Sequence, residues 1–153
     1  MNNIIVKGHI DVFPEDRCRL KKKKKPFEEQ TIVINISNDI GRLYRTFLLK
    51  EEGILLEPPP FGCHVTLNNG KTSFNVKQHK QYLKELQGKT ITLSLSVDMY
   101  QHWEFFLLSA DGHQLNKIRT DLGLPVKTDF HATIGRIHPL AKKPSVLSKF
   151  IYY

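Results

Sequence analysis

Alternating hydrophobic and polar residues predict β-strands along most of this chain. The clearest run is Thr31–Ser37, where every second residue is isoleucine, so these side chains share one face of a strand. Residues 89–97 place isoleucine, leucine and valine on one face in the same way. Further strands are predicted at residues 3–12, 61–68, 100–108 and 130–137.

Apolar residues at helical spacing predict three helices between the strands. One covers residues 39–50 and is capped by Ser37 or Asn38. The other two cover residues 76–86 and 111–123. Two stretches interrupt the regular pattern. Residues 13–30 predict a long charged loop, and Pro58–Pro60 predicts a stiff connector that cannot continue a helix.

The order of these elements repeats. Residues 31–68 predict strand, helix and strand, and residues 102–136 predict the same series. The last strand of each series carries a histidine motif. The two stretches match in pattern and not in residue identity, which indicates two halves related by internal pseudo-symmetry.

Each of these last strands contains the motif His-hydrophobic-Thr-hydrophobic, at residues 64–67 and 131–134. Side chains at positions i and i+2 of a strand point the same way, so each motif projects its imidazole and its hydroxyl from one face. If the two strands are neighbours, one site receives two imidazoles and two hydroxyls. The candidate catalytic residues are His64, Thr66, His131 and Thr133.

This residue set suits cleavage of a phosphodiester without a metal. Histidine titrates near neutral pH, so one imidazole can accept a proton while the other donates one. Threonine hydroxyls can donate hydrogen bonds to a phosphoryl oxygen as charge develops on it. A metal site is the weaker hypothesis, because neither histidine has a third ligand at an obvious spacing and threonine is a poor zinc ligand. A single His-x-Thr is usually structural, but two copies at equivalent places favour a functional site.

Length and composition favour one domain over residues 1–153, because the 153 residues are 40% hydrophobic and 25% charged. The only two cysteines, Cys18 and Cys63, do not make a zinc framework or a disulfide scaffold. The chain shows no apolar run of membrane-spanning length and its first residues lack a signal-peptide layout. The expected location is therefore the cytoplasm, without membrane association.

The net charge of +8 favours an anionic partner such as RNA, DNA, a nucleotide or an acidic membrane, and does not choose among them. Part of the excess lies in the consecutive lysines Lys21–Lys25. One interpretation of this run is a solvated loop. The other is a surface that attracts a phosphate-bearing substrate towards the site.

The paired motifs at residues 64–67 and 131–134 resemble those of the 2H phosphoesterase superfamily. The resemblance covers about residues 31–137. It implies an α+β, bilobal fold in which two antiparallel sheets with outer helices flank a central cleft. It implies a metal-independent phosphodiesterase that needs no cofactor, with His64 and His131 as the acid–base pair. Since such a site is quasi-symmetric, the sequence leaves open which histidine is the base.

Chains of this size with a basic N-terminal segment are similar to phage members of the superfamily that act against cyclic-oligonucleotide immunity. This implies cleavage of the 3′–5′ bonds of cyclic oligonucleotide signals by 2′-OH attack, which suppresses antiviral signalling in the bacterial host cytoplasm. One alternative is an RNA 2′,3′-cyclic phosphodiesterase or a 2′-5′ ligase-like enzyme. Another is a noncatalytic RNA-binding module. Oligomeric state is left open.

Four further residues are candidates for substrate binding. Arg136 follows the second motif where many superfamily members carry a basic residue. The others are aromatic residues that can stack on bases. They are Trp103, Tyr100 and Phe61, with Phe13 as a further stacking candidate. Trp103 can equally be a core residue, and Phe105 and Phe106 are expected in the core.

Overall fold

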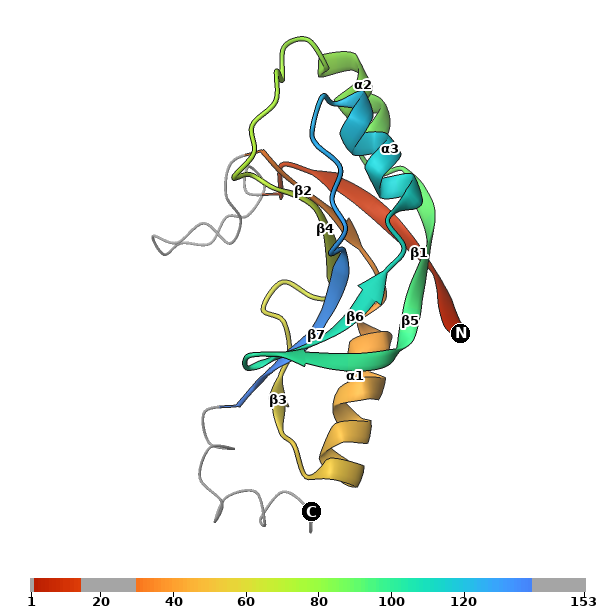
Figure 1. Ribbon diagram of the computed structural model, residues 1–153, viewed down its shortest axis with the longest axis vertical. Helices are drawn as coiled ribbons and strands as arrows, with labels where there is room; N and C mark the ends of the chain where they lie inside the picture. Colours follow the sequence, from red (N-terminus) through yellow and green to blue (C-terminus); the bar gives the residue numbers. More distant parts are fainter. Residues whose placement is uncertain (1, 15–29, 139–153) are drawn as a thin grey trace.

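The computed structural model describes residues 2–14 and 30–138 (Figure 1). The lysine run Lys21–Lys25 and Cys18 therefore lie outside the described residues. The strands are β1 (Asn3–Val12), β2 (Thr31–Asn35), β3 (Leu56–Glu57), β4 (His64–Asn69), β5 (Thr90–His102), β6 (Phe105–Ala110) and β7 (His131–Ile137).

All the strands belong to one sheet, with the order β3-β7-β4-β2-β1-β5-β6. Strand β6 also pairs with β7, so six strands from β7 round to β6 close into an antiparallel barrel. The short strand β3 adds to the outer side of β7, where Leu56 pairs with Ile137 and Glu57 with Arg136. Every pairing in the barrel is antiparallel.

The predicted fold class, an α+β bilobal fold with two antiparallel sheets on either side of a cleft, is wrong. The strands of both halves join into one closed ring instead, because β6 hydrogen-bonds to β5 on one side and to β7 on the other. Strand β7 in turn pairs with β4 of the first half. Most of the regular structure in the described part of the chain is strand, with three α-helices.

The helices lie close to their predicted positions. Helix α1 (Asn38–Phe47) continues into a π-helical turn, Leu48–Glu52, and the hydroxyl of Ser37 caps it by accepting a hydrogen bond from the Asp39 backbone N–H at 3.2 Å. Helix α2 (Lys80–Leu86) begins later than predicted, after a series of turns at residues 76–79. Helix α3 is His113–Asp121.

The strand predicted at residues 100–108 is wrong as a single element. Strand β5 runs on to His102, and the chain then reverses at Trp103 and Glu104 into β6. Trp103 has φ 58°, a left-handed conformation that is uncommon outside glycine and that suits a tight turn. The aromatic residues of this region therefore divide between two antiparallel strands.

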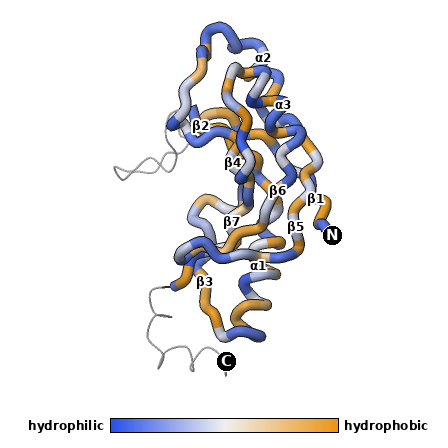
Figure 2. The backbone as a smooth tube through the Cα atoms, in the orientation of Figure 1, coloured by the Kyte–Doolittle hydropathy of each residue, from blue (hydrophilic) through white to orange (hydrophobic). Residues whose placement is uncertain are grey.

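Most of the buried hydrophobic residues form one cluster, to which alternate strand positions contribute. Figure 2 shows where hydrophobic residues lie along the chain. Ile32, Ile34 and Leu95 are each fully buried, as the period-two pattern predicts. Helix α3 adds Leu115 and Leu122 to the same cluster. No helix in residues 2–14 and 30–138 is long and apolar enough to span a membrane.

The order β2–α1–β4 in the first half recurs as β6–α3–β7 in the second, in agreement with the predicted repeat, although the π-helical turn and the short strand β3 intervene between α1 and β4. In both halves the helix connects two strands that pair with each other in antiparallel fashion. The two halves meet where β4 pairs with β7. The central four strands therefore follow the order β2-β4-β7-β6, which is symmetric about the β4–β7 pair.

Candidate functional site

Both His-x-Thr motifs lie on strands, as the sequence predicts, and each motif begins its strand. His64 is the first residue of β4, and His131 is the first residue of β7. The hydrophobic positions of the motifs are anchored in the core, since Val65, Leu67, Ala132 and Ile134 are at most 1% exposed. The histidines and threonines are half-buried and occupy the alternate positions, so they point away from that core.

The register of β4 on β7 brings the two motifs together. Val65 pairs with Ala132 in antiparallel orientation. The next positions on either side of this pair set His64 opposite Thr133 and Thr66 opposite His131. All four side chains then lie on one face of the sheet, in a square with two-fold symmetry about the Val65–Ala132 pair.

Equivalent hydrogen bonds orient the two imidazoles. Nδ1 of His64 lies 3.0 Å from the backbone oxygen of Gly62, and Nδ1 of His131 lies 2.8 Å from that of Asp129. A carbonyl oxygen can only accept, so Nδ1 is the protonated nitrogen in both rings. This leaves Nε2 in both rings as the atom that gains or loses a proton.

Burial lowers the pKa of His64 below its usual value near 6.5. The Gly62 carbonyl acts in the opposite direction, and the positive charge of His131 lowers the pKa further. His64 is therefore neutral at pH 7, with a lone pair on Nε2. This effect of His131 on His64 fits the places of the two imidazoles in the same square.

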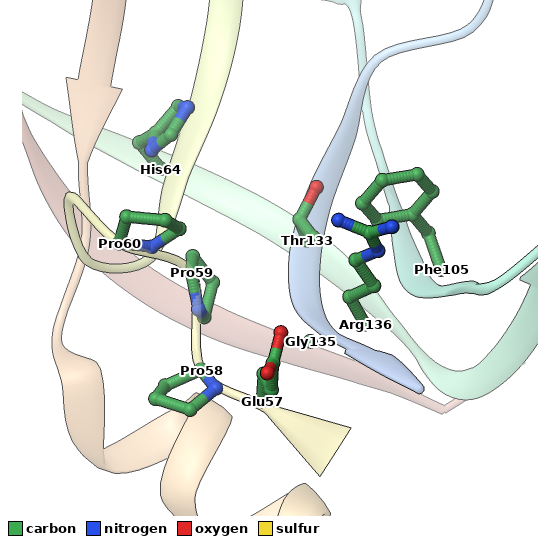
Figure 3. A pocket seen from close by; sticks show the side chains of 9 residues that line it. All are labelled: Glu57, Pro58, Pro59, Pro60, His64, Phe105, Thr133, Gly135 and Arg136. Carbon is green, nitrogen blue, oxygen red and sulfur yellow. The ribbon is translucent and has the colours of Figure 1, made fainter. Parts of the chain in front are cut away.

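A cavity of about 300 Å³ adjoins one end of the square (Figure 3). His64 and Thr133 line it, whereas Thr66 and His131 are not among its lining residues. The connector Pro58–Pro60 forms one wall, and Figure 3 shows Phe105 and Arg136 on the other side. The volume is at the small end of the range for ligand sites, so the cavity suits a group of roughly nucleoside size.

Arg136 lines the cavity with its charge already paired. Its Nε lies 3.0 Å from Oε2 of Glu104, and its Nη2 donates to Oε1 of the same carboxylate at 3.2 Å. These interactions with Glu104 raise the pKa of the guanidinium. The two-point contact fixes the plane of the guanidinium beside the cavity.

Phe105 is a cavity residue that the sequence prediction placed in the core. It is 40% exposed and lies opposite Arg136 on the neighbouring strand. The signal that identifies it is strand alternation. Phe106 and Leu108 are buried, so Phe105 must point to the other face of β6.

The remaining predicted substrate-binding aromatic residues lie outside this cavity. Phe61, Tyr100 and Trp103 are 39%, 40% and 83% exposed, and none is among the lining residues. Trp103 is therefore a surface residue at the β5–β6 turn and not part of the core. Phe13 packs against Phe74, with ring centroids 6.2 Å apart.

Within residues 2–14 and 30–138, no three His, Cys, Asp or Glu side chains come together in a way that could hold a metal ion. Cys63, next to His64, is a buried free thiol. Comparison with family models, curated proteins and solved structures found no match to this chain.

Proposed function

We propose that this protein is a metal-independent phosphodiesterase of the 2H type that cleaves 3′–5′ bonds of cyclic oligonucleotide signals. The observation that carries the proposal is the Val65–Ala132 register. It supports one site in which two imidazoles and two hydroxyls face the same substrate. The net charge of +8 fits an anionic substrate. The cyclic-oligonucleotide class itself comes from the resemblance of the motifs and chain size.

The reaction begins at the neutral imidazole. Nε2 of His64 takes the proton of a ribose 2′-OH, and the 2′-oxygen forms a bond to the adjacent phosphorus. The bond from phosphorus to the 5′-oxygen breaks, and Nε2 of His131 gives that oxygen a proton. The products are a 2′,3′-cyclic phosphate and a free 5′-hydroxyl. The lowered pKa of His64 favours it as the base, an assignment that the sequence left open.

The threonine hydroxyls fit the role of donors to the phosphoryl oxygens. Thr133 lies opposite His64, and Thr66 lies opposite His131. Each hydroxyl can therefore approach the phosphate without displacing an imidazole. A donor aimed at developing negative charge lowers the barrier more than it strengthens substrate binding. The buried free thiol of Cys63 fits a reducing compartment, such as the cytoplasm of a bacterial host of a phage.

The test is turnover in the presence of EDTA. The protein is incubated with a panel of cyclic di- and trinucleotides and with RNA bearing a 2′,3′-cyclic end, and the products are separated by mass. We expect cleavage of a cyclic oligonucleotide, and a loss of roughly 10²–10⁴-fold in His64→Ala and in His131→Ala. The matched control is His102→Ala, which alters an exposed histidine outside both motifs.

The other outcomes are equally informative. Cleavage of the RNA end alone would replace the cyclic-oligonucleotide assignment with the RNA-processing one. Binding of the panel without turnover would overturn the enzyme and leave a nucleic-acid-binding module. Wild-type turnover by either motif-histidine variant would remove that histidine from the mechanism.

A further inference from the structure

The junction between the two motif strands is unusually short. Strands β4 and β7 share one registered pair, Val65 with Ala132, whereas the ladders that flank them, β2–β4 and β6–β7, extend over five pairs each. The relative position of the imidazoles and hydroxyls depends on this junction, because a shift in register moves every side chain along it. Contacts other than the ladder must therefore hold the two motifs in place.

At one end of the square, Arg45 of α1 connects the two motifs. Its Nη1 donates to the backbone oxygen of Ile134, the residue after Thr133, at 2.8 Å. The charge of the same guanidinium acts on the thiol of Cys63, the residue before His64, and lowers its pKa against the larger effect of burial, which raises it. That thiol lies 3.7 Å from the backbone oxygen of Thr133. Arg45 therefore braces the row in which His64 stands opposite Thr133.

Gly41, one helical turn before Arg45, leaves the space that this contact needs. A Cβ atom at Gly41 would lie 2.7 Å from Nη1 of Arg45 and 2.5 Å from Sγ of Cys63. Any other residue would displace the guanidinium or the thiol. The close approach of α1 to the motif strands therefore depends on a glycine at this position.

At the other end of the square, Arg119 of α3 makes the equivalent connection. Its Nη1 donates to the backbone oxygen of Leu67, the residue after Thr66, at 2.7 Å, and its Nε donates to that of Pro125 at 2.8 Å. The carboxylate of Asp129, two residues before His131, acts on the same guanidinium electrostatically. Arg119 therefore braces the row in which Thr66 stands opposite His131.

We propose that Arg45 and Arg119 are a reciprocal pair of positioning residues, each of which fixes one row of the catalytic square from the helix of its own half. The inference rests on the proposed function and identifies how its geometry is maintained. Each guanidinium binds the carbonyl at the same motif position, directly after the threonine, in the other half of the molecule.

A lysine cannot replace either arginine in this role. Arg119 uses its planar set of donors to reach two separate segments at once. Arg45 binds a carbonyl of β7 while its charge acts on Cys63 beside β4. An ammonium group, by contrast, is a point charge on a flexible stem. Arg119 is only 5% exposed. Because water cannot solvate its buried charge, the carbonyl oxygens that it hydrogen-bonds must compensate that charge. Small displacements matter here, because a shift of about 1 Å in a catalytic group can cost roughly 100-fold in rate.

The experiment is a set of four double-mutant cycles measured as kcat and KM on the substrate that the wild type cleaves. Arg45→Met and Arg119→Met are each combined with Thr133→Ala and with Thr66→Ala. We expect each arginine variant alone to lower kcat by roughly 10- to 100-fold with little change in KM. Arg45→Met should be non-additive with Thr133→Ala and additive with Thr66→Ala, and Arg119→Met should show the reverse pattern.

The controls separate positioning from general stability. Arg42→Met and Lys117→Met remove exposed cations from the same two helices and should leave kcat unchanged. Thermal unfolding is measured for every variant. If Arg119→Met does not fold, Arg119→Lys takes its place. The two Arg45 cycles need no Arg119 variant and test the positioning role of Arg45 on their own. Additive losses in all four combinations would overturn the proposal.

A second readout does not depend on activity. In nitrogen-15 spectra of the imidazoles, Arg45→Met should shift the His64 resonances and leave those of His131 in place, while Arg119→Met should do the opposite. Arg45→Lys should not restore the wild-type spectrum, since it keeps the charge without the planar donor set. A wild type without turnover would overturn the proposed function alone. Arginine variants that shift both histidines or neither would overturn the positioning role.

Discussion

His64 and Thr133 face each other across the β4–β7 pair and line the same cavity, although they belong to different halves of the chain. A phosphodiester that enters this cavity therefore meets an imidazole and a hydroxyl together (Figure 3). Thr66 and His131 form the other row of the square, and neither of them lines the cavity. In the proposed mechanism the square thus gives the substrate one base, one acid and a donor beside each.

Replacing either motif threonine with alanine should slow the reaction by less than replacing either motif histidine. Each change removes one hydrogen bond to developing charge, for which a loss of roughly 10- to 10³-fold in kcat is expected. Thr133→Ser should restore most of the activity because it returns the hydroxyl. Thr92→Ala, an exposed threonine of β5, is the control. Full activity in Thr66→Ala or Thr133→Ala would deny that hydroxyl a catalytic role.

The lowered pKa of His64 predicts activity that persists into mildly acidic solution. A general base works only when neutral, and His64 stays neutral until the pH falls below a pKa that burial holds under 6.5. The acid limb of the kcat/KM profile of the wild type should therefore fall below pH 6.5. An acid limb above pH 6.5 would contradict the assignment of His64 as the base.

The same pKa shift has a consequence for stability. Between pH 6.5 and the lower pKa of folded His64, the unfolded chain binds a proton that the folded protein does not. The free energy of unfolding should therefore decrease as the pH falls through this window, and His64→Gln should remove that part of the decrease. Urea unfolding at a series of pH values for both proteins provides the measurement.

The local structure of both motifs followed from the sequence, because strand alternation and helix caps depend on neighbouring residues. The closed barrel did not. Whether β6 pairs with β7 as well as with β5 is decided by contacts between distant segments, which no local pattern specifies. The turn at Trp103 was missed because this position carries neither glycine nor asparagine, the usual signals for a left-handed turn.

The two arginines that brace the square, Arg45 and Arg119, were likewise not predicted from the sequence. Each binds a backbone oxygen of a distant strand, and a carbonyl acceptor has no sequence signature. Arg119 nevertheless had a local signal. It follows Leu115 by four positions and precedes Leu122 by three, so it lies on the buried stripe of α3. A charged residue in such a stripe indicates a buried polar partner.

Phe105 should contribute more to substrate binding than Trp103, since Phe105 lines the cavity and Trp103 is 83% exposed at the β5–β6 turn. Stacking of a base on an aromatic ring contributes about 1–3 kcal/mol. Phe105→Ala should therefore raise KM for a cyclic dinucleotide by roughly tenfold, and Trp103→Ala should change it less. A larger effect for Trp103→Ala would place the bound base at the hairpin turn and not in the cavity.

The lysine run Lys21–Lys25 supplies the last prediction, which tests long-range attraction of the substrate. If these charges attract an anionic substrate, replacing all five with serine should raise KM and weaken its dependence on salt. The change in kcat should be small, because attraction acts before the chemical step. A cyclic dinucleotide carries few phosphates, so its KM should change only a few-fold, and a longer RNA should show more. Measuring KM against ionic strength for the wild type and the five-serine variant distinguishes substrate attraction from a solvated loop. An unchanged KM at low salt, for both substrates, would assign the run to a solvated loop.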